Sequence, residues 1–224
     1  MNDRLTDRAF KDSAYLAMAE VSKAFANPKR LELLELLIQG PRSVDSLAGG
    51  SGQPIASASQ HLQVLKRGGL VRTQRRGKRI VYSLVPGVDQ AMVQIRALAT
   101  SCSPTLRETR RSFFETHGAS EDISPQTLQT ELAQGRALLL DLRPAPEFEH
   151  AHIAGALSLP IDQLPHRLDE LPRDRLLVAT CRGPQCTFAP QAVELLRAEG
   201  FRAVRLEACI AEWRLAGGAI ESGR

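Results

Sequence analysis

Residues 178–190 read VATCRGPQCTFAP, and the second half of the chain is best interpreted from this segment outward. A run of strand-forming residues ends at Cys181, and the pattern predicts that a helix begins near Phe188. Glycine, proline and a second cysteine, Cys186, lie between them. The stretch fits a reactive thiol in a cradle, a metal clip or an ordinary turn, so the rest of the sequence is needed to decide.

The loop after Cys181 has the features of an anion-binding cradle. A tight loop that runs into a helix turns backbone N–H groups inward, and the helix end adds partial positive charge. Both effects favour a thiolate and predict a lowered pKa for Cys181. Arg182 adds a neighbouring cation. We expect Gly183, Gln185 and Thr187 to form the cradle, with Thr187 as the helix N-cap.

The two cysteines of this loop leave several interpretations open. A C-x4-C spacing lacks the second ligand pair of a zinc site, so we expect no metal here. An inert cysteine at a strand end is the second interpretation. Cys186 either fills the first turn of the helix or, if the loop ends approach each other, forms a disulfide with Cys181. Cys209 is expected to be a packing residue in the C-terminal helical region.

Strands and helices alternate around this loop. Strands are expected at residues 137–143, 156–159, 176–180 and 203–206. Helices are expected at residues 124–134, 161–170 and 188–199. The alternation predicts a parallel α/β sheet, in which ligands bind at the carboxyl ends of the strands. Cys181 lies at one such end, and Asp141 and Arg143 lie at another.

Composition and charge predict two domains without a membrane span. The 224 residues contain no run of about 18 apolar residues, and the N-terminus is too polar for a signal peptide. Four cysteines are too few for a secreted disulfide scaffold, so a reducing cytoplasm is expected. Residues 1–117 hold 18 Lys and Arg against 10 Asp and Glu, whereas residues 118–224 hold 11 against 15. We therefore expect a polyanion-binding domain at 1–117 and a second domain at 118–224, joined by a linker at residues 117–122.

The basic half has the pattern of a helix-turn-helix. Asn27 and Pro28 are suited to begin one helix, and Ser43 caps a second, short one. A glycine-rich turn at residues 49–52 precedes a third helix from about residue 54 to 67. Its apolar face includes Ile55. Its polar face, which is expected to contact DNA, consists of Ser57, Gln60, Gln63 and Arg67.

A basic hairpin follows the third helix. The residues LVRTQRRGKRIVYSL alternate around a glycine in the manner of two antiparallel strands. Such a hairpin beside a helix-turn-helix is a wing that contacts phosphates or the minor groove. Its basic residues are Arg72, Arg75, Arg76, Lys78 and Arg79.

The motifs FANPKRLELLELL, SVDSLA and SASQHLQVLKRGGLVRTQRRGKRIVYSL together resemble the ArsR-type winged-helix repressors over about residues 14–100. The resemblance implies a homodimer on an inverted-repeat DNA operator, released by a chemical signal. Two sets of apolar residues suit a dimer interface. They are Tyr15, Met18, Val21 and Phe25 on an N-terminal helix, and Val88, Met92, Ile95, Ala99 and Cys102 on the last helix. SVDSLAGG lacks the cysteine or histidine of metal-sensing members, so no metal or other cofactor is expected.

Residues 141–156, DLRPAPEFEHAHIAGA, resemble the D-x-R…E-F…H-I-x-G-A signature of rhodanese sulfurtransferases, a resemblance that covers about residues 122–222. It implies that Cys181 attacks the outer sulfur of thiosulfate or another sulfane donor and carries it as a persulfide. Asp141 and Arg143 belong to the same signature. The active loop of the family reads C-x4-R, but here Cys186 replaces that arginine. This puts the binding of anionic donors in doubt unless Arg182 or Arg143 compensates.

The fold class is therefore two domains, a mainly-α winged helix-turn-helix followed by an α/β rhodanese-like parallel sheet. The leading hypothesis is a cytoplasmic, DNA-binding regulator in which Cys181 takes up sulfur from thiosulfate or polysulfide and Cys186 resolves it. The loop state would then change operator binding, with Ser103-Pro104 as a candidate hinge. Two alternatives stay open. One is a thiosulfate sulfurtransferase located or dimerised by its DNA-binding half, and the other is a non-enzymatic sensor of arsenite or another thiophilic ligand.

Overall fold

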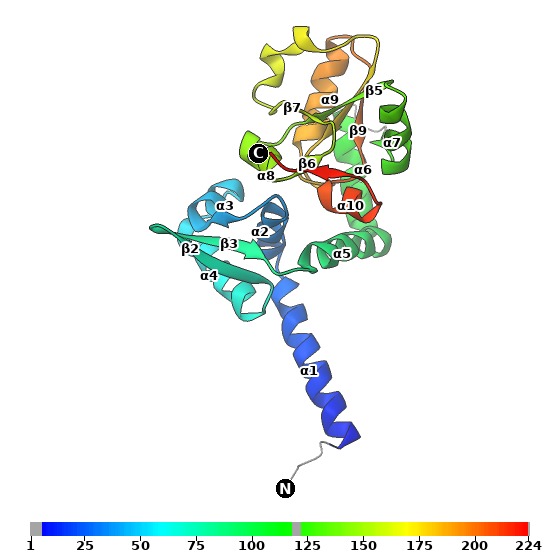
Figure 1. Cartoon of the computed structure of the whole chain (residues 1–224). Helices are drawn as coiled ribbons and strands as arrows, with labels where there is room; N and C mark the ends of the chain where they lie inside the picture. Colours follow the sequence, from blue (N-terminus) through cyan, green and yellow to red (C-terminus); the bar gives the residue numbers. More distant parts are fainter. Residues whose placement is uncertain (1–5, 118–121, 224) are drawn as a thin grey trace. The chain divides into compact units, whose positions relative to one another are not determined.

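The computed structural model describes residues 6–117 and 122–223, so most of the expected linker lies outside the described residues. The chain divides into two compact units between Met92 and Val93, and each unit is described by itself (Figure 1). No helix within the described ranges is both long enough and apolar enough to cross a membrane.

The first unit is a winged helix. Its elements are α1 (Asp7–Phe25), α2 (Pro28–Ile38), β1 (Arg42–Ser43), α3 (Val44–Gly50), α4 (Ile55–Arg67), β2 (Val71–Arg76), β3 (Arg79–Leu84) and the start of α5 (Val88–Cys102). The predicted caps are present. Asn27 Oδ1 accepts the N–H of Arg30 at 3.1 Å, and Ser43 Oγ accepts that of Ser46 at 3.3 Å. The expected turn at residues 49–52 is shorter, because α3 continues through Gly50.

The wing is the hairpin β2–β3, which extends a small antiparallel sheet of order β1-β3-β2. Gly77 has φ +60°, and none of the described residues other than glycine has a positive φ. A glycine with positive φ at the first central position is typical of a type II′ turn. The register places Arg76 directly opposite Arg79 across this turn.

The core of the first unit is built mainly from leucines of α2, α3 and α4, including Leu33, Leu47 and Leu62. Val88 and Met92 also lie in this core, so these two residues do not form the expected dimer seam. Cys102, which was expected to pack in the apolar seam of the last helix, is exposed. Ile55, which was expected on the apolar face of α4, is exposed as well.

The last helical region is two helices, with the break at the expected hinge. α5 ends at Cys102 and α6 (Pro104–Thr116) begins with a proline, while Ser103 Oγ accepts the N–H of Leu106 at 3.2 Å. The remaining elements of the second unit are β4 (Asp122–Ile123), α7 (Pro125–Ala133), β5 (Ala137–Asp141), α8 (Ala145–His150), β6 (His152–Ile153), β7 (Leu157–Ser158), β8 (Leu176–Thr180), α9 (Phe188–Ala198), β9 (Ala203–Leu206), α10 (Ile210–Leu215) and β10 (Ile220–Glu221).

The second unit is a five-stranded, wholly parallel sheet of order β4-β9-β8-β5-β7. Successive residues of β8 point to opposite faces of this sheet. Leu177 and Ala179 pack with α9, whereas Val178 packs with residues of α7 and α10 (Figure 1). The predicted helix at residues 161–170 is instead two short 3-10 turns. Strands β4, β6 and β10 were not predicted, because two-residue strands leave no periodic pattern.

One ion pair and one cation–π contact tie α5 and α6 to the other elements of the second unit. Arg205 of β9 bonds Asp122 and lies 3.7 Å from the centre of the Phe114 ring of α6. Arg96 of α5 forms an ion pair with Glu212 of α10 and lies 3.8 Å from the sulfur of Cys209. Cys209 is fully buried and caps α10. It is therefore both a packing residue, as predicted, and a helix cap.

Gly218 has a steric role that a substitution can test. A Cβ at this position would lie 2.1 Å from Nε1 of the buried Trp213, which donates to Ala219 O at 3.0 Å. We expect Gly218→Ala to destabilise the second unit by about 1–3 kcal/mol, measured by urea unfolding followed through the single tryptophan. Gly49→Ala is the matched control, because a Cβ there meets nothing within 4 Å. An unchanged unfolding midpoint for Gly218→Ala contradicts this prediction.

Candidate functional site

The pairing of β5 with β8 brings the predicted site residues to one edge of the sheet. Asp141 is the register partner of Thr180, and the N–H of Leu142 donates to Thr180 O at 3.0 Å. Residues that follow β5 therefore lie beside those that follow β8. Asp141, Arg143 and Cys181 therefore lie at the carboxyl edge of the sheet.

Asp141 and Arg143 form a buried ion pair. Their side chains are 1% and 3% exposed, and Arg143 Nε lies 2.9 Å from Asp141 Oδ1. A second guanidinium nitrogen donates to Ala151 O at 2.9 Å. The pair joins the end of β5 to the end of α8, and the charge of Arg143 is neutralised by its own strand.

The loop after β8 curls so that its two cysteines meet. The N–H of Cys186 donates to Gly183 O at 2.9 Å, which closes a turn. The sulfur of Cys181 lies 3.9 Å from Gly183 O and 3.9 Å from Cys186 O. The thiols of Cys181 and Cys186 are near enough for each to shift the pKa of the other. Both are free thiols, and Cys181 is only 7% exposed.

The backbone of the loop affects both thiols. Backbone hydrogen bonding at Gly183 and Ala189 lowers the pKa of Cys181, and that at Phe188 and Arg182 lowers the pKa of Cys186. Gln185 and Thr187, in contrast, are exposed, and the Thr187 side chain makes no capping hydrogen bond. The cradle is thus made of backbone amides.

The two thiols have opposite pKa shifts, which differs from the expectation for Cys181. Burial, followed by the hydrogen bond with Cys186 and the charge of Cys186, raises the pKa of Cys181. The hydrogen bond from Cys181 is the largest influence that lowers the pKa of Cys186 to about 7, against the opposing effect of burial. Backbone amides and the charge of Arg182 assist. The sequence did not show this, because the shift depends on how the folded loop places the two thiols relative to each other.

Glu147 is a site residue that the sequence analysis did not single out. Arg182 Nη2 lies 2.6 Å from Glu147 Oε1, and Arg182 Nε lies 3.0 Å from Oε2, so the contact is bidentate. Glu147 is 3% exposed, and the Arg182 guanidinium lies 5.2 Å from the centre of the Phe188 ring. The sequence signal for Glu147 was its place as the acidic residue of the E-F motif, because an ion-pair partner of Arg182 has to be acidic.

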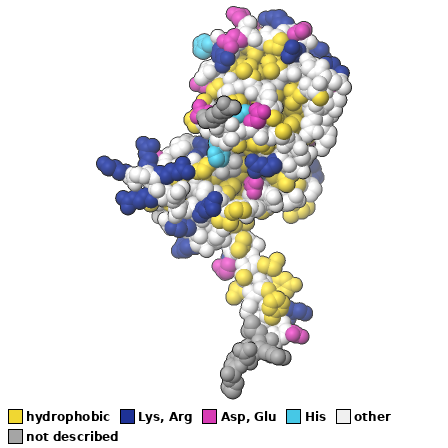
Figure 2. All heavy atoms as spheres, in the orientation of Figure 1, with side chains coloured by type: hydrophobic (Ala, Val, Ile, Leu, Met, Phe, Trp, Pro, Cys, Tyr) yellow, Lys and Arg dark blue, Asp and Glu magenta, His cyan; other side chains and the backbone are white. Residues whose placement is uncertain are grey.

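The predicted DNA-contacting residues lie on an exposed surface of the first unit. Gln60, Gln63 and Arg67 of α4 are exposed, and Ser57 is half-buried. Figure 2 shows a cluster of basic side chains over the wing. The five wing residues are all exposed, namely Arg72, Arg75, Arg76, Lys78 and Arg79. Arg75 Nε donates to Gly77 O at 3.1 Å, which holds this side chain at the turn.

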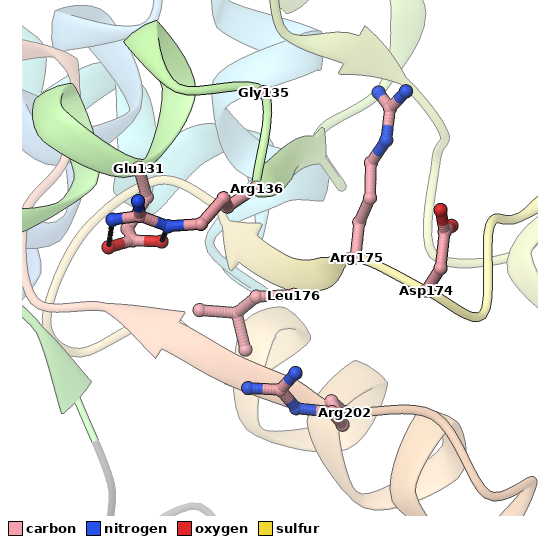
Figure 3. A pocket seen from close by; sticks show the side chains of 7 residues that line it. All are labelled: Glu131, Gly135, Arg136, Asp174, Arg175, Leu176 and Arg202. Atoms are coloured by element: carbon pink, nitrogen blue, oxygen red, sulfur yellow. Dashed lines mark hydrogen bonds and ion pairs between the residues drawn. The ribbon is translucent and has the colours of Figure 1, made fainter.

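A hollow of about 360 Å³ lies at the opposite, amino edge of the sheet (Figure 3). Arg136, Arg175 and Arg202 line it, and each directly precedes a strand. Arg136 is paired with Glu131, whose Oε1 lies 2.7 Å from Nη2. Because parallel strands place their two ends at opposite edges, this hollow is separate from the thiol loop.

A winged helix with an exposed basic hairpin, joined to a rhodanese-like sheet with a cysteine in its active loop, defines a class of transcriptional regulators. The model of the rhodanese-like domain matches residues 124–216, and that of a helix-turn-helix domain matches residues 25–74. The HTH-type transcriptional regulator Rv0324 of Mycobacterium tuberculosis is 39% identical over 211 residues, which cover 92% of this chain and 91% of that protein. The chain belongs to this family of ArsR-type winged-helix regulators with a C-terminal rhodanese-like domain.

Two further similarities concern one half each. A sulfurtransferase of Allochromatium vinosum is 34% identical over 95 residues, covering 42% of this chain and 83% of that protein. The homodimeric winged helix-turn-helix DNA-binding domain of Mb0332 from Mycobacterium bovis, solved by NMR, is 36% identical with a TM-score of 0.41. It covers 46% of this chain and 93% of that one.

The pKa values predict how the loop is alkylated. Iodoacetamide should react slowly with Cys186 below pH 7, where the thiol is protonated, and reach a plateau above it, because its pKa is about 7. Cys181→Ala should move the midpoint to higher pH, since it removes the hydrogen bond that lowers this pKa. Peptide mass spectrometry in a Cys102→Ser background measures both. An unmoved midpoint, or alkylation of Cys181 before Cys186, contradicts the assignment.

Proposed function

We propose that this chain is a cytoplasmic repressor in which the Cys181–Cys186 pair takes up sulfane sulfur and thereby alters operator binding. The observation that carries the proposal is the curled loop, which brings the Cys181 sulfur within 3.9 Å of Cys186 O and so places the two thiols near each other. A simple sulfurtransferase needs one thiol in its cradle, whereas two neighbouring thiols can be bridged if the loop brings their sulfurs into bonding distance. The rhodanese-like fold and the similarity to a sulfurtransferase support sulfur chemistry at this loop.

The chemistry needs no cofactor. A thiolate attacks the outer sulfur of thiosulfate, the S–S bond of the donor breaks, and sulfite leaves with the electron pair. Family resemblance assigns this attack to Cys181, which becomes a persulfide. The second thiol then attacks the cysteine sulfur of the persulfide, giving a disulfide and releasing hydrogen sulfide. The bridged product is the same whichever cysteine attacks first.

In this proposal, the first unit binds the operator, and the state of the thiol loop changes that binding. α4 presents Gln60 and Gln63 to base edges, and the wing presents its arginines to phosphates. α1 carries a set of exposed apolar side chains that water disfavours, and a second copy of the chain would cover them. They are Phe10, Tyr15, Leu16, Met18 and Val21. A homodimer built on α1 would place two α4 helices on an inverted-repeat operator.

The alternative function is sulfur transfer without regulation, and it is favoured by the similarity to the Allochromatium sulfurtransferase. Under this alternative, transfer from thiosulfate to an acceptor thiol survives Cys186→Ser. The same substitution abolishes a bridged switch.

The first prediction of this proposal concerns mass and operator binding together. Polysulfide treatment of the reduced protein should yield a bridge, seen as loss of two hydrogens or gain of sulfur with both thiols consumed. Operator affinity should change in the same sample, measured by fluorescence anisotropy. Cys181→Ser and Cys186→Ser should each prevent both changes, while Cys102→Ser should prevent neither. Operator affinity that stays constant while the bridge forms contradicts the proposed switch.

The second prediction concerns the wing. Arg76→Ala combined with Arg79→Ala should weaken binding to all DNA sequences and reduce the salt slope of log K by about 0.9 for each phosphate that the variant no longer neutralises. Gln60→Ala should instead weaken operator binding more than non-specific binding. Arg111→Ala is the control, because this exposed arginine of α6 is paired with Glu108. Equal weakening by Arg111→Ala and by the wing variant contradicts the assignment.

A further inference from the structure

The charge balance around the thiol loop indicates which sulfur donors it accepts. The loop has a cysteine, Cys186, where rhodaneses have an arginine, so an anionic donor would need another cation. The sequence offers Arg182 and Arg143 for this purpose. The structure shows that each of them is already paired with a buried carboxylate.

The Arg182 contact is the decisive one, because Arg182 directly follows Cys181 in the loop. It holds Glu147 through both carboxylate oxygens, with nitrogen–oxygen distances of 2.6–3.1 Å. Glu147 is 3% exposed, and a buried carboxylate is strongly disfavoured without its partner. Arg182 therefore stays with Glu147 when a donor arrives. The pairs Arg182–Glu147 and Arg143–Asp141 carry no net charge, and an ionised thiol makes the site negative.

A negative site disfavours a dianion more than a neutral donor. We propose that the Cys181–Cys186 pair takes sulfur from donors without negative charge on the sulfur chain, such as dialkyl trisulfides, and that Glu147 sets this selectivity by neutralising Arg182. The inference rests on the proposed sulfane-sulfur function and narrows its substrate class. Glu147 touches no reacting atom and acts as a specificity-determining residue through Arg182.

The reaction with a trisulfide balances without another reagent. One cysteine thiolate attacks the central sulfur of R–S–S–S–R, and one RS⁻ leaves with the electron pair of the broken bond. The second cysteine thiolate attacks the same sulfur and displaces the other RS⁻. The two cysteine protons end on two RSH molecules. The central sulfur remains as a Cys–S–S–S–Cys bridge, and the trisulfide is the oxidant.

The test compares two donors on the full-length reduced protein. Second-order rate constants are measured for thiosulfate and for bis(2-hydroxyethyl) trisulfide by timed alkylation and mass spectrometry, and each is divided by the rate of 2-mercaptoethanol with the same donor. The wild-type protein should favour the trisulfide in this normalised comparison. Glu147→Gln should raise the thiosulfate rate by about tenfold and leave the trisulfide rate unchanged, because Arg182 then keeps its charge.

Glu149→Gln is the matched control, since it removes the same charge from an exposed position on the same helix. It should change neither rate. A second measurement needs no variant: the wild-type thiosulfate rate should not fall as salt rises, because a neutralised site has no attraction to screen.

Three results overturn the inference. They are a thiosulfate rate that drops steeply with salt, a normalised preference for thiosulfate, or a Glu147→Gln effect that is equal for both donors. In these cases the bridge still forms, and the proposed function stands. If neither donor modifies the cysteine pair, the proposed function fails and the inference fails with it.

Discussion

The register between β5 and β8 is the constraint on which the rhodanese-like unit depends. Asp141 opposite Thr180 fixes where both strands end, and hence which side chains share the carboxyl edge. A slip of one residue would turn Leu139 and Val178, both fully buried, to the opposite face of the sheet. The hydrophobic cores on both faces therefore hold the thiol loop in place. The loop geometry is a consequence of packing several residues away.

The site combines a soft nucleophile, a cysteine thiolate, with two ion pairs that carry no net charge, Arg182–Glu147 and Arg143–Asp141. Rhodanese loops of the C-x4-R form bring the cation of that last arginine to the donor, whereas this loop has a second sulfur, Cys186, at the same position. Backbone amides stabilise the thiolate, since Gln185 and Thr187 face solvent and both nearby arginines hold carboxylates. Such a site is suited to a change of state that persists, because bridging consumes both thiols. Rapid turnover would require that one thiol be regenerated at each cycle.

Local signals predicted most elements, and contacts distant in sequence account for the differences. The caps at Asn27 and Ser43 and the strand at residues 176–180 were correct, because each depends on a few neighbouring residues. The burial of Val88 and Met92 was not predicted, since heptad spacing cannot tell which partner covers a face. The Arg182–Glu147 pair spans 35 positions, and no periodicity reports such a contact.

The wing has one further consequence. Arg76 and Arg79 lie directly opposite each other at the turn, and like charges in that arrangement repel. In the absence of DNA, this repulsion raises the free energy of the hairpin tip, which is where phosphates would bind. Anions that bind between these guanidinium groups weaken the repulsion. Part of the binding free energy therefore comes from reduced repulsion within the protein. Salt ions screen the same repulsion, so the free energy of the tip depends on ionic strength even before DNA binds.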